Sequence, residues 1–288
     1  MNTVHKVIFG NSASMQEINS ESIQLILTSP PYFNAPFDYK GYYQDYKKYL
    51  RIMRMMVKES YRVLEEGRIF ALNIDDMLID SIKYPITADL TRIFIEEGFS
   101  FRDRIIWKKP DGYGRISRRS GVLFQNPYPM YFYPDNLLES IIIFQKGKFH
   151  YKKIPQNIKE KSKIDINIVK NQKWFFNLWE ITNVLPNDKL SKGVAAFPDQ
   201  LAYRIISLFS YVEETVLDPF LGSGTTMKVS RLLNRNCIGI EILESLELKI
   251  LEKTGFSSSR QGDLTTFKDE ITITKRTKGK FKLTKNYG

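Results

Sequence analysis

The sequence predicts a doubly wound α/β fold around a mainly parallel sheet. Short apolar runs typical of buried strands alternate along the chain with amphipathic stretches of helical period. The expected strands are 4–9, 23–27, 68–74, 101–108, 140–144, 215–217 and 237–241, and the expected helices are 45–65, 86–97, 199–210, 227–233 and 245–253. Gly67 and Gly98 are expected to end the first two helices, because glycine accepts the left-handed backbone found there.

The composition indicates a cytoplasmic protein with an anionic partner. Of the 288 residues 42% are hydrophobic, enough for one large domain or a domain with an insertion. Cys237 is the only cysteine, which excludes an internal disulfide, and no apolar run reaches the about 18 residues that span a membrane. The N-terminus has no signal-peptide core. A net charge of +11 and a pI of about 9.4 favour nucleic acid as the partner, with a basic protein of a lysine-rich genome that has no such partner as the alternative.

One stretch combines a buried strand with an unusually stiff turn: Leu25-Ile26-Leu27-Thr28-Ser29-Pro30-Pro31-Tyr32. Proline cannot continue a strand ladder and fixes its own backbone, so the chain is rigid where the strand stops. Open α/β sheets bind ligands at such strand ends. From these residues alone, a binding site and a plain proline turn both remain open. The aromatic segment 33–46 that follows has no period, and we expect it to be a loop over the substrate.

A second stretch, 215–241, has the organisation of a nucleotide-binding half: strand, glycine-rich turn, helix and a strand that ends in an acid. Its turn is Asp218-Pro219-Phe220-Leu221-Gly222-Ser223-Gly224-Thr225-Thr226, and the acid is Glu241. Glycines let the backbone approach a ligand, and a carboxylate suits the two hydroxyls of a ribose. The turn is neither the G-x-G-x-x-G fingerprint nor a phosphate-binding Walker loop.

These two motifs resemble those of β-group amino DNA methyltransferases. Asp218–Thr226 resembles their S-adenosylmethionine motif, and Thr28–Tyr32 resembles their catalytic motif, in the Ser-Pro-Pro-Tyr form common in cytosine-N4 enzymes. The catalytic motif comes first, which is the circularly permuted order of that group. The resemblance implies a permuted Rossmann-like methyltransferase fold with a basic target-recognition insert. It also implies S-adenosylmethionine as cofactor, duplex DNA as substrate and a cognate restriction endonuclease as partner, and it leaves monomer or dimer open.

The resemblance also assigns the site residues. Ser29 and Pro30 are expected to accept hydrogen bonds from the exocyclic amine, Pro31 to stiffen the turn, and Tyr32 to stack on a flipped base. The implied cofactor site is Asn11, Thr28, Phe197, Pro198, Asp218, Pro219, Phe220, Gly222, Gly224, Thr225, Glu241 and Ile242. Glu241 is expected at the ribose and Phe220 and Ile242 at the adenine, with plain core packing as the alternative for these two. At Asn11 the family usually has an aspartate that contacts the adenine amine, and Asn11 offers only its carbonyl.

Basic residues are the expected DNA contacts, with a solvated surface charge as the alternative for each. They are Arg115, Arg118, Arg119, Lys146, Lys148, Lys152 and Lys153. The expected division of the chain is a catalytic half (1–145), a target-recognition insert (146–192), a cofactor half (193–260) and a basic C-terminal extension (261–288), which is a hairpin or a partly disordered arm.

Other activities are alternatives to this one. Adenine-N6 methylation is the main alternative, followed by methylation of RNA or of a protein amide, and by a nucleic-acid-binding protein without activity. A serine hydrolase is disfavoured, because the chain has only two histidines and no G-x-S-x-G. Cys237 lies inside a strand without a Pro-Cys motif, which indicates a buried structural thiol. One cysteine and two histidines predict no metal site.

Overall fold

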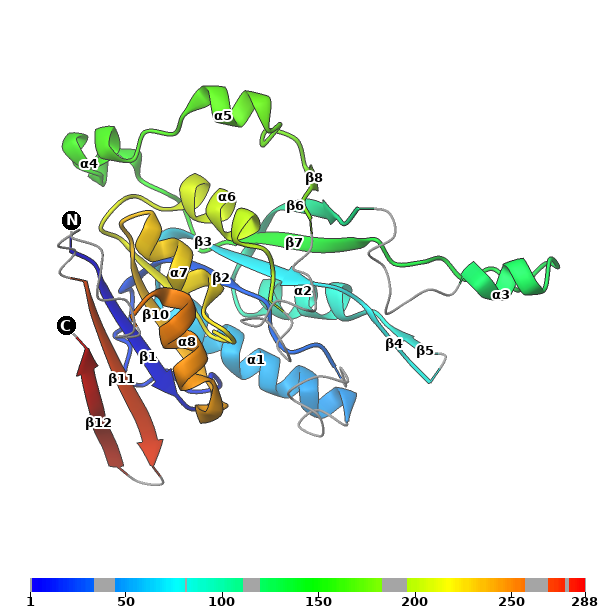
Figure 1. Cartoon of the computed structure of the whole chain (residues 1–288), viewed down its shortest axis with the longest axis horizontal. Coiled ribbons are helices and arrows are strands. Elements are labelled where there is room, and N and C mark those ends of the chain that lie inside the picture. The colour runs from blue at the N-terminus through cyan, green and yellow to red at the C-terminus, as the bar shows by residue number, and fades with distance from the viewer. Residues whose placement is uncertain are drawn as a thin grey trace.

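The chain folds around one large sheet with helices on both faces (Figure 1). The computed structural model describes residues 2–33, 45–80, 82–110, 120–182, 196–256, 269–277 and 280–287. Within them the sheet strands are β1 (Val4–Phe9), β2 (Ile23–Thr28), β3 (Leu64–Ile74), β6 (Ser100–Lys108), β7 (Leu138–Gln145), β8 (Leu178–Glu180), β9 (Thr215–Asp218), β10 (Asn236–Glu241), β11 (Glu270–Thr277) and β12 (Lys280–Tyr287). A separate small hairpin comprises β4 (Met77–Ile79) and β5 (Ile82–Tyr84).

The strand order in the sheet is β12-β11-β1-β10-β9-β2-β3-β7-β6-β8. The pairs from β11 through β3 are parallel, whereas β7 runs antiparallel to β3 and β6, and β12 runs antiparallel to β11. The predicted doubly wound, mainly parallel α/β sheet is therefore confirmed. We call the edge at which β1, β2, β3, β9 and β10 end the carboxyl edge, and the opposite one the amino edge.

Two groups of helices cover the two faces of this sheet. Helices α1 (Tyr46–Val63) and α2 (Ile86–Glu96) lie on one face, and α6 (Asp199–Phe209), α7 (Thr225–Leu232) and α8 (Glu247–Thr254) lie on the other. Alternate residues of β2 show why both faces are apolar: Ile26 packs with the α1–α2 cluster, while Leu25 and Leu27 pack with α6. A strand buried on both faces needs such a continuous apolar run.

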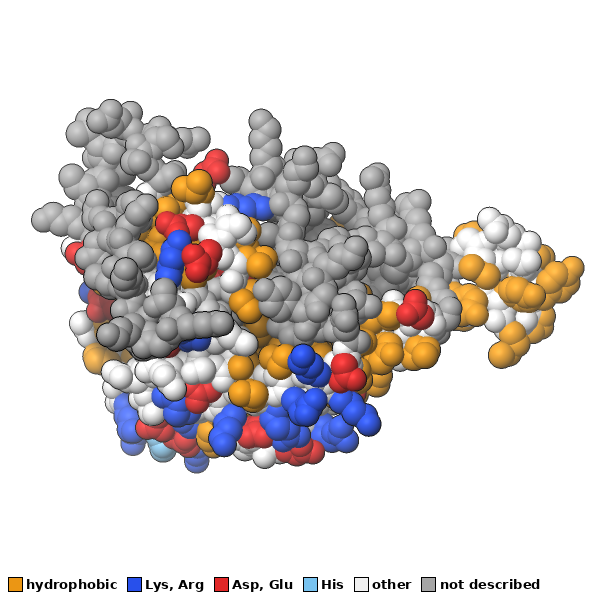
Figure 2. Space-filling view, turned by 90° about the horizontal axis from the view of Figure 1, so that it is seen from below, with side chains coloured by type: hydrophobic (Ala, Val, Ile, Leu, Met, Phe, Trp, Pro, Cys, Tyr) orange, Lys and Arg blue, Asp and Glu red, His pale blue; other side chains and the backbone are white. Residues whose placement is uncertain are grey.

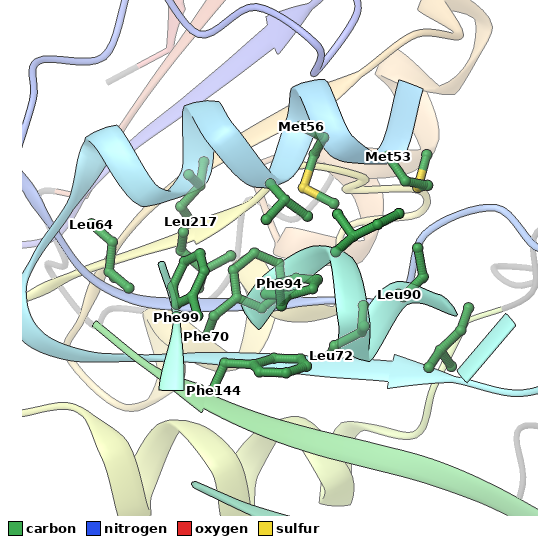
Figure 3. Packing of buried hydrophobic residues seen from close by; sticks show 14 of the residues in the cluster. Met53, Met56, Leu64, Phe70, Leu72, Leu90, Phe94, Phe99, Phe144 and Leu217 are labelled. Atoms are coloured by element: carbon green, nitrogen blue, oxygen red, sulfur yellow. The ribbon is translucent and has the colours of Figure 1, made fainter. Parts of the chain in front are cut away.

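The largest core cluster lies between α1, α2 and the sheet (Figure 3). Phe94 of α2 stacks on Phe144 of β7 with ring centroids 4.0 Å apart, and Phe70 of β3 meets Phe94 edge-on at 4.7 Å. Met53 and Met56 of α1 are fully buried above these rings. The methionines of this helix therefore belong to the core, as their helical spacing predicts.

The two glycines expected at helix ends have different outcomes. Helix α1 ends at Val63 and the chain enters β3 directly at Leu64, so the prediction that Gly67 ends this helix is wrong. Gly67 lies within β3 with φ +85°, where a Cβ would come 2.5 Å from the Phe149 backbone. Close approach of another segment requires glycine there. Gly98, with φ +102°, follows α2 as predicted.

The segment 146–182 contributes to the main core as well as to the surface. It contains the 3-10 turn η2 (Tyr151–Lys153), α4 (Gln156–Lys161), α5 (Ile166–Asn171) and β8, which pairs parallel with β6 at the sheet edge. Trp179 of β8 is 1% exposed, and its indole nitrogen donates to the Trp174 carbonyl at 3.2 Å. Trp107 of β6 donates to the Ile181 carbonyl at 2.8 Å. The end of the expected insert is thus built into the sheet.

Two further features extend the molecule beyond its core. At the C-terminus β11 and β12 form a hairpin, and β11 pairs parallel with β1, so the hairpin alternative for the extension is the one observed. Between β6 and β7 an arm carries α3 (Ser120–Gln125) away from the sheet (Figure 1). The arm exposes large apolar side chains, visible as an orange projection in Figure 2: Phe124, Tyr128, Met130, Tyr131 and Phe132.

Candidate active site

The two stretches singled out in the sequence meet at the carboxyl edge. Strands β2 and β9 are paired neighbours, with Leu25 opposite Val216, so Ser29–Tyr32 follows one strand and the turn after Asp218 follows the next. Thr28 Oγ1 donates a hydrogen bond of 2.6 Å to Asp218 Oδ1, and both side chains are buried. Residues 190 positions apart in the chain are therefore joined directly at this edge.

Asp218 organises the turn that follows β9. Its carboxylate accepts hydrogen bonds from Thr28 Oγ1, from Thr226 Oγ1 at 2.6 Å and from the Phe220 N–H at 3.0 Å. Burial raises the pKa of Asp218 to about 6, although these three donors oppose the shift. The Asp218 carboxylate therefore ties β2, the turn and α7 together.

The glycine-rich turn is shaped by left-handed backbone and by Glu241. Gly222 and Gly224 have φ values of +54° and +93°, a region open mainly to glycine. Glu241, 2% exposed, accepts from the Gly222 N–H at 2.8 Å through Oε2 and from the Leu243 N–H at 2.9 Å through Oε1. Helix α7 begins at Thr225, so its first N–H groups face the turn.

Two hollows open beside this turn and share Phe220. The first hollow is lined by Gly10, Asn11, Ser12, Pro31, Pro219, Phe220, Ile240, Glu241 and Ile242. The second hollow is lined by Ser29, Ala196, Phe197, Asp218, Phe220, Leu221, Gly222, Ser223 and Thr225. The structure thus brings together most of the expected cofactor residues, and it adds Gly10, Ser12, Ile240, Ala196, Leu221 and Ser223. Pro198 is buried at the start of α6, next to Phe197, and Gly224 precedes α7.

The C-terminal hairpin supports one wall of the first hollow. Arg276 of β11 donates to the Asn11 carbonyl at 2.5 Å and to the Ser14 carbonyl at 2.7 Å, and it forms an ion pair with Glu17 at 2.6 Å. The Asn11 side-chain carbonyl accepts from the Ala13 N–H at 2.9 Å. The acceptor expected at Asn11 for the adenine is therefore engaged in a local turn.

Tyr32 and Ser29 belong to a hydrogen-bonded network whose other members lie outside both sequence motifs. The Tyr32 hydroxyl donates to Glu139 Oε2 at 3.0 Å, and Asn73 Nδ2 donates to the same oxygen at 2.9 Å and to Ser29 Oγ at 3.4 Å. Lys109 forms an ion pair with the other oxygen of Glu139. Burial, followed by the Glu139 charge, raises the pKa of Tyr32 above its usual value, so Tyr32 remains a donor.

Glu139 and its neighbours were missed because they lie outside both motifs. Glu139 is a half-buried acid near the start of β7, two positions before the apolar run Ile141–Phe144, and an acid so close to such a run is the signal that could have identified it. Asp75 follows β3 nearby, and its carboxylate accepts a hydrogen bond from Asn136. Burial raises the pKa of Asp75 to about 6. Two acidic side chains, Glu139 and Asp75, therefore lie at the carboxyl edge beside Ser29.

The expected DNA contacts have different outcomes. Lys146 is 5% exposed, and its ammonium group donates to the Leu64 carbonyl at 2.7 Å and to the Tyr61 carbonyl at 2.9 Å. It also pairs with Glu21 at 3.2 Å. The prediction that Lys146 contacts DNA is therefore corrected, because its donors are used to join α1 to β3.

The remaining basic residues do not gather around Ser29 in the described structure. Lys148, Lys152 and Lys153 are exposed, but they follow β7, which runs antiparallel and ends at the amino edge. Arg115, Arg118 and Arg119 lie outside the described residues, as does most of the aromatic loop expected over the substrate (34–44).

Cys237 is fully buried in β10, and burial raises the pKa of its thiol, which confirms a structural thiol. No group of three or more His, Cys, Asp or Glu side chains among the described residues could hold a metal ion. In the same part of the chain, no helix combines the length and the hydropathy needed to cross a membrane.

Solved structures share this fold. TTHA0409 from Thermus thermophilus, described as a putative DNA modification methylase, matches with a TM-score of 0.71 and 23% identity, covering 94% of this chain and 99% of that one. A second structure of TTHA0409 is complexed with S-adenosyl-L-methionine. PvuII DNA methyltransferase, described as cytosine-N4-specific, matches with a TM-score of 0.68 and 20% identity, covering 90% and 89%. These likenesses confirm a Rossmann-like methyltransferase fold.

Relatives in sequence identify the family of this chain. Type II methyltransferase M.MjaI from Methanocaldococcus jannaschii is 33% identical, over 90% of this chain and 94% of its own length. Type II methyltransferase M.MthZI from Methanothermobacter thermautotrophicus is 31% identical, over 84% and 74%. The family model N6_N4_Mtase, described as DNA methylase, matches residues 23–252. The chain therefore belongs to the N6/N4 DNA methylase family, which methylates amino groups of DNA bases with S-adenosylmethionine as the cofactor.

Proposed function

We propose that this enzyme transfers a methyl group to the exocyclic N4 of cytosine in duplex DNA, as the modification partner of a restriction endonuclease. The setting is supported by M.MjaI and M.MthZI, which are named Type II methyltransferases. The choice of cytosine is supported by Ser29, because the Ser-Pro-Pro-Tyr form of the motif is common in cytosine-N4 enzymes.

The two hollows suit the two ends of S-adenosylmethionine. In the first hollow the buried Glu241 carboxylate is oriented by two backbone N–H groups and suits the ribose hydroxyls, while Phe220 and Ile242 offer apolar surface to the adenine. The second hollow is lined by hydroxyl groups and by the glycine turn, which suits the amino-acid end. The cofactor supplies a methyl group already activated by its sulfonium.

The proposal is supported most directly by the position of Ser29, which lines the same hollow as the glycine-rich turn. An amine held at Ser29 is therefore adjacent to the space proposed for the methyl donor. Transfer from an activated donor needs chiefly alignment and exclusion of water. The rigid ends of β2 and β9, joined by the Thr28–Asp218 hydrogen bond, provide that alignment.

The network around Ser29 prepares it to hold the amine. An exocyclic amine is a poor nucleophile, because its lone pair is delocalised into the ring, and acceptors for its N–H groups favour a tetrahedral nitrogen. Ser29 Oγ and the Pro30 carbonyl are those acceptors, and the second proline, Pro31, fixes the direction of the carbonyl. Asn73 lies 3.4 Å from Ser29 Oγ, and Glu139 fixes the Tyr32 ring on which a flipped base stacks.

DNA is proposed to approach the carboxyl edge. Arg115, Arg118 and Arg119 follow β6, whose last residue Lys108 lies at that edge, and they are the proposed phosphate or base contacts. Lys148, Lys152 and Lys153 would meet only DNA that extends to the amino edge. We retain the permuted division into a catalytic half (1–145), an insert (146–192), a cofactor half (193–260) and an extension (261–288) as part of this proposal.

Product analysis tests the proposed function. The full chain is incubated with methyl-labelled S-adenosylmethionine and unmethylated plasmid DNA, and the DNA is digested to nucleosides. N4-methyldeoxycytidine is the expected product. N6-methyldeoxyadenosine would contradict the choice of base, and transfer to RNA alone would contradict the substrate.

Substitution of Ser29 tests the mechanism. We expect Ser29→Ala to lower the transfer rate by about 100-fold or more, because one preorganised acceptor is lost. Binding of S-adenosylhomocysteine, measured by calorimetry, should change by less than about twofold. Ser22→Ala is the matched control, since Ser22 donates to the Asn19 carbonyl away from both hollows. Wild-type turnover by Ser29→Ala would refute the role of Ser29.

A further inference from the structure

A lysine of α8 lies behind the turn that lines the second hollow. Lys253 Nζ donates to Ser223 Oγ at 2.8 Å and to Thr225 Oγ1 at 2.6 Å. Ser223 and Thr225 line the second hollow and are 1% and 4% exposed. A positive charge is therefore held one hydrogen bond away from the hollow, by two residues that are themselves rigidly buried.

The direction of these hydrogen bonds determines what the two hydroxyls can offer. An ammonium group only donates, so both hydroxyl oxygens are acceptors in these contacts. Each O–H hydrogen must then point elsewhere, and within the described part of the chain neither hydroxyl donates a hydrogen bond to another group. Both are donors polarised by a cation, and Thr225 also begins α7, whose first N–H groups add positive potential. This arrangement selects an anion.

We propose that Lys253 is a positioning residue that acts through Ser223 and Thr225 to hold the carboxylate of the cofactor's methionine part. S-adenosylmethionine carries two cations, the sulfonium and the α-ammonium, and its carboxylate is the one anion that these donors favour. Fixing the carboxylate also fixes the direction in which the sulfonium methyl faces Ser29, which lines the same hollow. The inference deepens the proposed use of the second hollow and rests on it.

Two ligands separate the amino-acid end, which carries the carboxylate, from the rest of the cofactor. S-adenosylhomocysteine keeps the amino-acid end, whereas 5′-deoxy-5′-methylthioadenosine has the adenosine and the sulfur but neither the carboxylate nor the α-ammonium. We expect Lys253→Met to weaken S-adenosylhomocysteine by about 10-fold, because the Ser223 and Thr225 hydroxyls remain but lose the cation that polarises them, and to weaken methylthioadenosine by less than about twofold. Lys253→Arg should restore much of the loss. Lys249→Met, one turn earlier on α8, is the control for the lost charge.

The outcomes distinguish this inference from the proposed site. Equal weakening of both ligands by Lys253→Met, or no weakening of either, would refute the role of Lys253 and leave the site standing. Failure of the unmodified chain to bind S-adenosylhomocysteine would refute both. Ser223→Ala provides a second route if Lys253→Met does not fold. It should weaken S-adenosylhomocysteine selectively, and the same change in both ligands would overturn the inference.

Discussion

The hydrogen bond from Tyr32 to Glu139 predicts that two residues 107 positions apart act as one unit in catalysis. Tyr32→Phe removes only the hydroxyl and keeps the ring for stacking. Glu139→Gln keeps the size of the side chain but removes the charge that holds Tyr32, Asn73 and Lys109. Each change releases the Tyr32 ring from its fixed orientation.

The magnitude follows from the kind of bond. A hydrogen bond to a charged group contributes about 1.5–3 kcal/mol, and the lower end applies here because Glu139 keeps Asn73 and Lys109 as partners when Tyr32 is changed. We therefore expect Tyr32→Phe to slow single-turnover methyl transfer by about 10-fold. Glu139→Gln should cost at least as much, and the double variant should cost less than the product of the two losses, with a coupling of about 1 kcal/mol.

The assay is single-turnover transfer from labelled S-adenosylmethionine to a duplex oligonucleotide, with S-adenosylhomocysteine binding measured alongside. Binding should stay unchanged, because Tyr32 and Glu139 line neither hollow. Tyr46→Phe is the matched control, since the Tyr46 hydroxyl donates to Asp89 at 2.7 Å and lines neither hollow. Fully additive losses in the double variant, or normal transfer by Tyr32→Phe, would show that the Tyr32–Glu139 contact does not position the base.

Two further predictions concern stability. Burial raises the pKa of Asp218 to about 6, so the folded state binds its proton more tightly than the unfolded chain, and this group's contribution to stability falls as pH rises from about 4 to 6. We expect the free energy of unfolding, measured with urea, to fall by up to about 3 kcal/mol less between about pH 4 and 6 in Asp218→Asn than in the wild type. The same pH profile in both proteins would contradict the raised pKa of Asp218. Lys146→Met leaves the Tyr61 and Leu64 carbonyls without their donor and should lower the free energy of unfolding by about 2–4 kcal/mol. The salt dependence of DNA binding by Lys146→Met should match that of the wild type and that of Lys148→Met, which changes an exposed lysine. A weaker salt dependence for Lys146→Met alone would show that Lys146 contacts a phosphate.

The fold and the two main motifs could be predicted because local signals are strong there. Continuous apolar runs at β2, β9 and β10 fit strands buried on both faces, and Gly222 and Gly224 fit a left-handed turn before a helix. Gly67 shows the limit of such signals. Gly67 does have a positive φ, but glycine is required there because the backbone of Phe149 approaches it closely. Nothing near Gly67 in the sequence indicates this contact.

The candidate site shows the same limit. Glu139 and Asn73 join Ser29 and Tyr32 only because β7 and β3 are paired, with Asn73 opposite Ile141. Lys146 looks like a surface charge in a basic stretch, yet three partners from distant segments bury it. Asn11 has the acceptor that the resemblance asks for, but a local turn engages it.

The sequence by itself determined the type of sheet, the two ligand-binding strand ends and the chemistry those ends support, because strand burial, turn geometry and side-chain type are local properties. Only the tertiary structure decided which strand ends meet. In the folded chain β2 pairs with β9, Glu139 accepts a hydrogen bond from Tyr32, and Lys253 donates to Ser223. The lysines after β7 lie at the amino edge, because β7 is antiparallel to β3. These facts depend on strand order and on the reversed direction of β7, which arise from the packing of the whole sheet and have no local signal in the chain.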